Sequence, residues 1–195
     1  MRGCWPTVPP GTRYRLQAGF SLVEALVVVG LIGVLTAIAV LVMPIAIQSA
    51  TADSGATRVA SALRIAREQA ISQRRTVQVA FNAPNQIVVS RLEVPGPGTT
   101  VLSTTVLEDG IGFRLFAGVP DTPDAFGNAT ATAFGGAGTV AFSSEGTFMD
   151  QNGDPVNGTV FLGKEGQTLS ARAVTIFGPT ALVREWRWTG NQWGN

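Results

Sequence analysis

A long uncharged segment near the amino terminus constrains this chain more than any other feature. Between Ala25 and Ile47 there are 23 residues and no charged side chain. At a rise of about 1.5 Å per residue, a helix of this length covers about 35 Å, which exceeds the roughly 30 Å hydrocarbon core of a bilayer. We therefore predict a membrane-spanning helix at about residues 22–47.

An ordinary membrane anchor explains this segment, and a cleaved secretory signal peptide is the other simple interpretation. The apolar core of a signal peptide is usually about 7–15 residues long, so the length argues against a signal peptide. A single acid, Glu24, lies at the entrance of the segment, three residues after Ser21. This S-x-x-E spacing predicts a capping box, in which the Ser21 hydroxyl accepts the backbone N–H of Glu24 and the carboxylate accepts that of Ser21.

The residues just before the helix resemble a processing signal. Gly19 is followed directly by Phe20, and Glu24 comes four residues later, where the apolar run begins. This arrangement resembles the type III signal of type IV pilins and type II secretion pseudopilins. The resemblance implies that a membrane prepilin peptidase cuts after Gly19, that Phe20 becomes the N-methylated amino terminus, and that Glu24 is required for subunit assembly.

A physical argument supports the assembly role that the resemblance gives to Glu24. A carboxylate that enters lipid costs a few kcal/mol unless it is paired. Cleavage after Gly19 would create a positive α-amino group on Phe20. If that group lay beside Glu24 of a neighbouring subunit, both charges would be satisfied. Capping and assembly are therefore compatible roles for one acid.

Residues 1–19 have the composition of a cytoplasmic leader, with three arginines and no acid. Positive residues beside a membrane helix stay in the cytoplasm, so we expect the chain after about Ile47 to lie outside the inner membrane. The only cysteine, Cys4, is in this leader. The mature domain then has no disulfide, whereas many major type IV pilins have one, and this favours a pseudopilin. Without the leader, 11 basic and 13 acidic residues give a formal charge of −2, which does not suggest general polyanion binding.

The sequence pattern changes after Gln48. Small apolar residues recur there at steps of three and four, the period of an amphipathic helix; they are Ala52, Ala56, Val59, Leu63, Ala66 and Ala70. We expect one nearly continuous helix from about Ser21 to Gln73, within a helical region of residues 20–75, with a local loosening near Pro44 and Gly55. Its second half would lay this apolar face on a globular domain.

Beyond Arg75 the period drops to two, which is typical of β-strands. Residues 76–81 and 86–92 predict a hairpin. Further strands are predicted at 100–107, 111–116, 138–142, 158–162, 171–177 and 181–188, with a long loop at 118–137. The predicted fold is α+β: a long amino-terminal helix, transmembrane in its first half, packed on an antiparallel β-sandwich-like domain at residues 76–195.

The carboxy-terminal third resembles the domain shared by type II secretion protein H and related minor pilins, on residues 142–146 and 173–188. In the DNA-uptake members, a Gly-Arg-x-Arg stretch is associated with DNA binding. Here Ala181 and Leu182 stand at its first two positions, and only Arg184 is kept. Arg184 and Arg187 are the nucleic-acid contacts of this alternative interpretation. The strand also places Trp186 and Trp188 on one face, for which we favour structural packing.

The residues that enzymes most often use are missing. The chain has no histidine, and its mature part has no cysteine, which removes the usual general base and two metal ligands. Residues 150–155 begin like a calcium loop, but Pro155 stands where the turn needs glycine and Phe161 where an acid is needed. We predict a polar turn there, no enzymatic activity, no metal site and no cofactor.

Together these features predict a minor pseudopilin of a type II protein secretion system. It would be processed by prepilin peptidase, anchored once in the bacterial inner membrane and assembled with other pseudopilins into a helical periplasmic fibre. Secreted cargo is a further candidate partner, and nucleic acid is not expected. Two alternatives stay open: a minor type IV pilin that primes pilus assembly or binds DNA during uptake, and a single-pass membrane protein with an extracytoplasmic binding domain and no processing.

Overall fold

The fold is described from a computed structural model, which describes residues 21–108, 110–135 and 139–195. The chain divides into two compact units between Met43 and Pro44. This boundary falls within helix α1 (Leu22–Gln73), so the first part of the helix belongs to one unit and its second part to the other.

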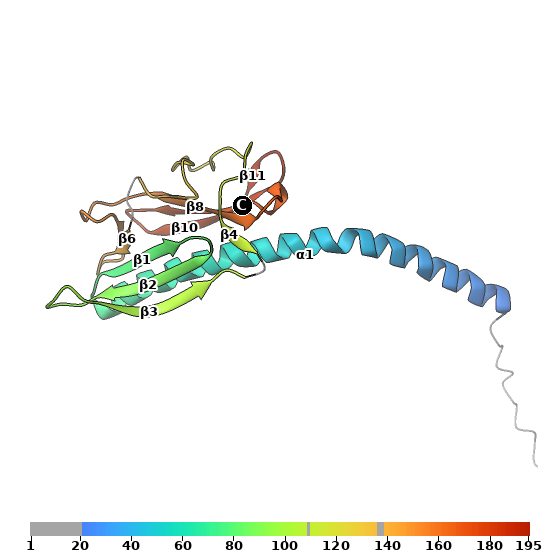
Figure 1. Cartoon of the computed structure of the whole chain (residues 1–195), viewed down its shortest axis with the longest axis horizontal. Coiled ribbons are helices and arrows are strands. Elements are labelled where there is room, and N and C mark those ends of the chain that lie inside the picture. Colours follow the sequence, from blue (N-terminus) through green and yellow to red (C-terminus); the bar gives the residue numbers. More distant parts are fainter. Residues whose placement is uncertain (1–20, 109, 136–138) are drawn as a thin grey trace, which may run out of the picture. The chain divides into compact units, whose positions relative to one another are not determined.

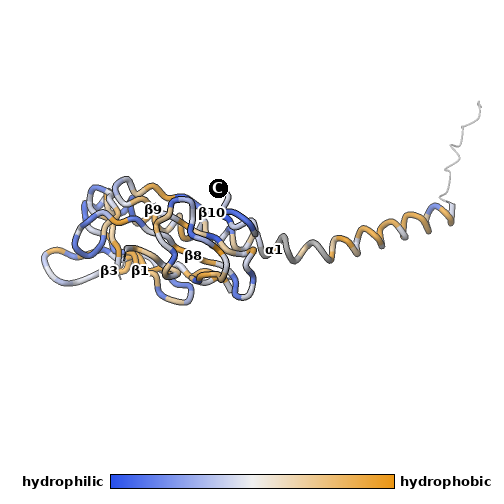
Figure 2. The backbone as a smooth tube through the Cα atoms, turned by 90° about the horizontal axis from the view of Figure 1, so that it is seen from above, coloured by the Kyte–Doolittle hydropathy of each residue, from blue (hydrophilic) through white to orange (hydrophobic). Residues whose placement is uncertain are grey.

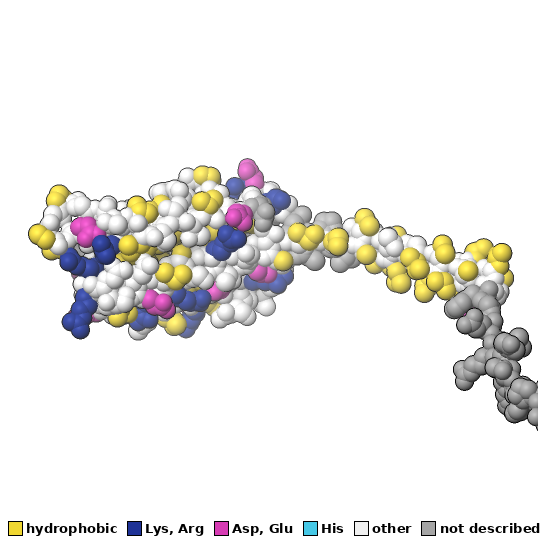
Figure 3. All heavy atoms as spheres, turned by 90° about the horizontal axis from the view of Figure 1, so that it is seen from below, with side chains coloured by type: hydrophobic (Ala, Val, Ile, Leu, Met, Phe, Trp, Pro, Cys, Tyr) yellow, Lys and Arg dark blue, Asp and Glu magenta, His cyan; other side chains and the backbone are white. Residues whose placement is uncertain are grey.

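The first part of α1 is an apolar helix with exposed side chains. Its stretch Leu22–Val40 is long and apolar enough to cross a membrane, and none of it is buried within the protein. Figure 2 shows the apolar residues that follow one another along this part of the helix, and Figure 3 shows their side chains on its surface. A helix that is apolar on all sides suits a lipid environment.

The helix is continuous from Leu22 to Gln73, so neither Pro44 nor Gly55 breaks it. Gly55 instead allows close packing: a Cβ at this position would lie 3.0 Å from Ile111 and 3.1 Å from Leu162. The end at Gln73 matches the prediction. There Arg74 takes the left-handed conformation (φ 51°), and the N–H of Arg75 donates to the carbonyl of Ala70, a Schellman-type ending built without glycine.

Two antiparallel sheets make up the rest of the second unit, which confirms the predicted α+β class (Figure 1). In spatial order the first sheet contains β3 (Thr99–Val106), β2 (Gln86–Leu92), β1 (Val77–Asn82), β6 (Val140–Phe142) and β7 (Phe148–Met149). The second contains β11 (Trp193–Gly194), β10 (Leu182–Trp188), β9 (Arg172–Phe177), β8 (Gly158–Lys164) and β4 (Ile111–Phe113), and β5 (Thr132–Ala133) also pairs with β8. A 3₁₀ turn, η1 (Thr168–Ser170), lies between β8 and β9.

All eight predicted strands are present, although β4 ends three residues earlier than expected. Sequence analysis missed β5, β7 and β11. Each of these strands has only two residues, which is too short to show a period-two pattern.

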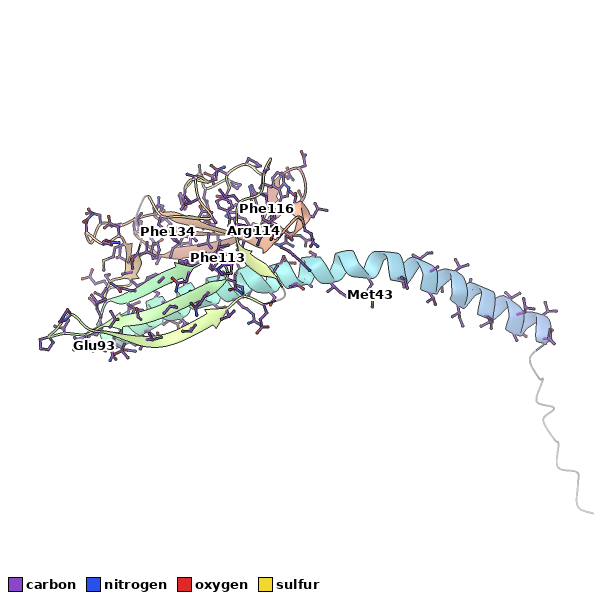
Figure 4. The ribbon with its side chains drawn as sticks, viewed as in Figure 1. Met43, Glu93, Phe113, Arg114, Phe116 and Phe134 are labelled. Carbon is purple, nitrogen blue, oxygen red and sulfur yellow. The ribbon has the colours of Figure 1, made fainter. Side chains whose placement is uncertain are left out.

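The second part of α1 and the two sheets share one hydrophobic core. All six small apolar residues predicted to face the domain are buried, from Ala52 to Ala70. They belong to the same cluster as Val79 of β1 and Val174 of β9. Phe81 bridges the sheets: its ring lies 5.6 Å from that of Phe113 and 5.3 Å from that of Phe134, centroid to centroid. Phe113 and Phe134 are labelled in Figure 4.

The opposite face of the second sheet carries a smaller core, covered by the segment that follows β4. Trp188 and Trp193 lie there with their ring centroids 5.4 Å apart, next to Phe161. The predicted long loop covers this face through specific contacts. The indole N–H of Trp193 donates to the carbonyl of Pro120 at 2.9 Å, and Asp121 accepts the backbone N–H of Gly127 at 2.8 Å.

Arg172 of β9 fastens α1 to the second sheet. Its side chain is 1% exposed. Its guanidinium donates to the Asp53 carboxylate at 2.5 Å, to the hydroxyl and carbonyl of Ser49, and to the carbonyls of Leu169 and Ala171. Because a buried guanidinium needs this many acceptors, the pairing fixes the second sheet against residues 49–53 of the helix.

We predict that Arg172→Ala lowers the free energy of unfolding of this unit by about 3 kcal/mol, because it removes the buried guanidinium that is bonded to Asp53 and Ser49 and opens a cavity. Urea unfolding of the full chain in detergent, followed by tryptophan fluorescence, measures the loss. The matched control is Arg187→Ala, which removes a half-exposed guanidinium 3.8 Å from the same Asp53 and should cost about 0–1 kcal/mol. Equal losses in the two variants would contradict this role for Arg172.

Candidate processing and assembly site

The first turn of α1 places an acid at the entrance of the apolar helix. Ser21 precedes the helix, and its hydroxyl accepts the backbone N–H of Val23 at 3.3 Å, where the capping box predicted the N–H of Glu24. The Ser21 carbonyl accepts the N–H of Ala25 at 3.0 Å, the first helical hydrogen bond. This is the geometry of a helix N-cap.

Glu24 lies in this first turn and is exposed. Among the described residues, no group donates a hydrogen bond to its carboxylate. The amino-terminal end of a helix favours a negative charge there, so the acid suits its position even though the predicted reciprocal bond to Ser21 is not made. Gly19 and Phe20, the predicted cleavage site, lie outside the described residues.

The two arginines of the nucleic-acid alternative each have a carboxylate partner in the second unit of the chain. Arg184 Nη1 lies 2.7 Å from an Asp124 oxygen, and Arg187 Nη1 lies 3.8 Å from an Asp53 oxygen. On the face that Arg184 shares, Trp186 is half-buried and its indole N–H donates to Thr175 at 3.0 Å. The charges of Arg184 and Arg187 are therefore partly neutralised within the chain, and the indole of Trp186 is packed and hydrogen-bonded within the domain.

Asp124 is a structural residue that sequence analysis did not find. Its side chain is 12% exposed. Its carboxylate accepts hydrogen bonds from the Thr175 hydroxyl at 2.6 Å, from Arg184 at 2.7 Å and from the Trp186 indole at 3.2 Å. The sequence holds no signal for this role, because the donors come from two strands more than 50 residues away.

The segment that begins like a calcium loop is a turn held by Asp150. One oxygen of this carboxylate accepts the backbone N–H of Asn152 at 2.8 Å and that of Asp154 at 3.0 Å. Hydrogen bonds from the backbone of Asp154, and then from that of Asn152, lower the pKa of the Asp150 carboxyl. Within the described ranges, no cluster of three or more acidic, cysteine or histidine side chains is arranged to hold a metal ion.

The amino-terminal region of the chain matches a known sequence motif. Residues 14–40 match the prokaryotic N-terminal methylation motif. A search of curated protein sequences gives no significant match.

Two solved structures align with this chain. The minor pseudopilin EpsH from the type 2 secretion system of Vibrio cholerae aligns with a TM-score of 0.47 and 15% sequence identity, over 70% of this chain and 96% of that chain. The type IV minor pilin FimU of Pseudomonas aeruginosa aligns with a TM-score of 0.46 and 15% identity, over 68% of this chain and 90% of that chain.

The methylation motif covers the start of the apolar helix α1, and the α+β domain follows that helix in the chain. The motif implies processing by a prepilin peptidase and assembly into fibres. A single apolar helix before the domain is consistent with a single-pass membrane anchor and a carboxy-terminal domain outside the cytoplasm.

We predict that Asp124→Ala destabilises the domain by about 2 kcal/mol, because it leaves the buried Thr175 hydroxyl and the Arg184 guanidinium without their acceptor. Thermal unfolding followed by near-ultraviolet circular dichroism tests this, since Trp186 reports on the site directly. Asp154→Ala, which removes an exposed acid from the Asp150 turn, serves as the control. If the Asp124→Ala variant is as stable as that control, the Asp124 carboxylate does not stabilise the domain.

Proposed function

We propose that this chain is a minor pseudopilin of a type II protein secretion system. The observation that carries the proposal is the methylation motif, which leads into an exposed apolar helix with Glu24 in its first turn. Two features favour secretion over DNA uptake. The mature chain has no cysteine, and Arg184 is held by Asp124 in the domain.

The proposed pathway begins in the inner membrane. A prepilin peptidase hydrolyses the bond between Gly19 and Phe20, and the new amino group of Phe20 is methylated. The cleaved subunit then enters a helical fibre in which the positive amino terminus of one subunit pairs with Glu24 of another. In an apolar bundle of helices this pair has no competing water, so it selects the axial position of each incoming subunit.

The domain is proposed to serve as a structural part of the fibre, with no catalytic activity. Two described carboxyls have clearly shifted pKa values, Glu93 and Asp150, and both are shifted downward. A hydrogen bond from Thr100, and then one from Arg91, lowers the pKa of Glu93. Both groups stay charged at neutral pH, whereas a general acid or base needs a pKa near the working pH.

We predict that Glu24→Ala is cleaved normally but enters fibres at least tenfold less often than the native chain, because the amino terminus of a neighbour loses its counter-ion. Co-expression with a prepilin peptidase and the other pseudopilins, followed by shearing and quantitative immunoblotting, measures cleavage and incorporation separately. Glu145→Ala removes an exposed carboxylate from the domain and should assemble like the native chain. Normal incorporation of Glu24→Ala would show that Glu24 only favours the amino-terminal end of the helix and is not needed for assembly.

Deletion of the gene distinguishes a pseudopilin of protein secretion from a minor pilin of pilus assembly or DNA uptake. For a pseudopilin, secreted proteins should accumulate in the periplasm while surface pili and DNA uptake are unchanged. Loss of pili or of transformation with normal secretion would favour the minor pilin. In that case, Arg184→Ala together with Arg187→Ala tests whether DNA retention depends on these two arginines.

A further inference from the structure

A groove in the second unit takes no part in the processing and assembly site. It has a volume of about 770 Å³ and lies between α1, η1 and the carboxy-terminal strands of the second sheet. Its lining includes Ser49 and Asp53 of α1, Leu169 of η1, and Arg187 and Trp188 of β10. All of these residues belong to the second unit of the chain. We call it the Arg187 groove.

The Arg187 groove has more positive than negative charge. Asp53 is the one acidic side chain among the described residues that line it, and two arginines share its carboxylate. The buried Arg172 lies 2.5 Å from one oxygen, whereas Arg187 lies 3.8 Å from the other. The Arg187 side chain is 57% exposed, and within the described part of the chain its guanidinium makes no hydrogen bond. One positive charge therefore faces the groove without a close partner, which favours an anionic ligand.

Leu169 adds an exposed apolar side chain to the same groove. It lies on the short turn η1 and is 61% exposed. Arg172 holds this turn against α1, because one terminal nitrogen of its guanidinium donates to the carbonyl of Leu169 at 3.1 Å and the other to the carbonyl of Ser49 at 3.3 Å. Leu169 and Ser49 are therefore fixed neighbours within the second unit.

The place of Ser49 in the chain brings the groove to the membrane surface. The uncharged run of α1 continues to Ile47, which is 57% exposed, and Ser49 follows about 3 Å farther along the helix. The headgroup layer on each side of a bilayer is roughly 5–8 Å thick. With the run in lipid, Ser49 and its neighbour Leu169 lie at the depth of the headgroups. This depth follows from the order of residues along the helix and from hydrogen bonds within one unit, so it does not depend on the angle between the two units.

We propose that the Arg187 groove binds the headgroup phosphate of a membrane phospholipid, with Leu169 inserted beside the acyl chains. Lipid binding here rests on the membrane anchor of the proposed function and gives the domain a site of its own on the bilayer. The planar guanidinium of Arg187 matches two phosphate oxygens, and Leu169 leaves water when it enters the interface. A phospholipid supplies both contacts in one molecule, because its phosphate lies next to its acyl chains.

The depth of Leu169 in a bilayer tests the proposal in the full chain. The only cysteine is removed by Cys4→Ser, and Leu169→Cys carries a nitroxide in vesicles of phosphatidylethanolamine and phosphatidylglycerol. Electron paramagnetic resonance, with oxygen and a water-soluble nickel chelate as relaxing agents, should place this label at the level of the headgroups.

Val94→Cys is the matched control, because Val94 is 64% exposed and its carbonyl accepts a hydrogen bond from Arg75, just past the other end of α1. Gln73, the last residue of that helix, lies about 36 Å from Ser49 along the helix axis. Figure 4 shows Glu93, the residue before Val94, at that end of α1. The Val94 label should be as accessible to the nickel chelate as a label in water.

A label in the anchor separates failure of this site from failure of the proposed function. Leu35, which is 59% exposed on the apolar helix, should carry a label that oxygen reaches and the nickel chelate does not. A water-accessible label at Leu35 would overturn the anchor and the lipid site together. A Leu35 label in the bilayer with a Leu169 label as accessible as that at Val94 would overturn the lipid site alone. Protection of Leu169 that appears only when other pseudopilins are added would assign the groove to a neighbouring subunit and would also overturn it.

Arg187→Ala tests the phosphate contact. Native mass spectrometry of the full chain, released from detergent micelles that contain phosphatidylglycerol, should show a bound lipid, and Arg187→Ala should weaken this binding about tenfold. Arg184→Ala removes a half-exposed arginine of the same strand that also has a carboxylate partner, and it should bind the lipid like the native chain. Equal binding by the two variants, or a bound mass of phosphate alone, would overturn the proposal.

Discussion

The packing of a narrow stripe of small residues on α1 is the contact on which the rest of the domain depends. Alanines at positions 52, 56, 66 and 70 are buried, and a Cβ at Gly55 would lie only 3.0 Å from Ile111 and 3.1 Å from Leu162. These small residues let the helix approach both sheets closely enough for Leu63 to enter their shared core. A larger residue in the stripe would separate the helix from at least one sheet.

Hydrogen bonds from Arg172 fix the position of α1 along the sheets. Apolar contacts alone allow a helix to slide along a sheet, because they are not directional. The bonds from Arg172 to Asp53 and Ser49 fix one axial position, at the start of the segment that packs on the domain. In the proposed fibre, force applied to the anchor would reach the β domain through this point. The helix on the amino-terminal side of it keeps its apolar surface for lipid or for neighbouring subunits.

Some features of the structure could be predicted from the sequence and others could not, for physical reasons. Helix α1 and the longer strands were predicted because their periods of three to four and of two repeat often enough to be recognised. Gly55 was misjudged because a glycine that breaks a helix and one that allows close packing look alike in a sequence. The role of Asp124 was not predictable, since its partners Thr175 and Arg184 meet it only in the folded chain. At the amino terminus, the spacing of Gly19, Phe20 and Glu24 was informative because a peptidase reads it as a linear signal.

The central claim is that the chain becomes a fibre subunit through processing at its amino terminus. Intact-mass analysis of the protein purified from a cell with a prepilin peptidase tests this claim most directly. The account predicts a chain that begins at Phe20, carries one additional methyl group and lacks Arg13 and Arg15. A mature protein that retains those two arginines would contradict it and would leave α1 as an ordinary membrane anchor.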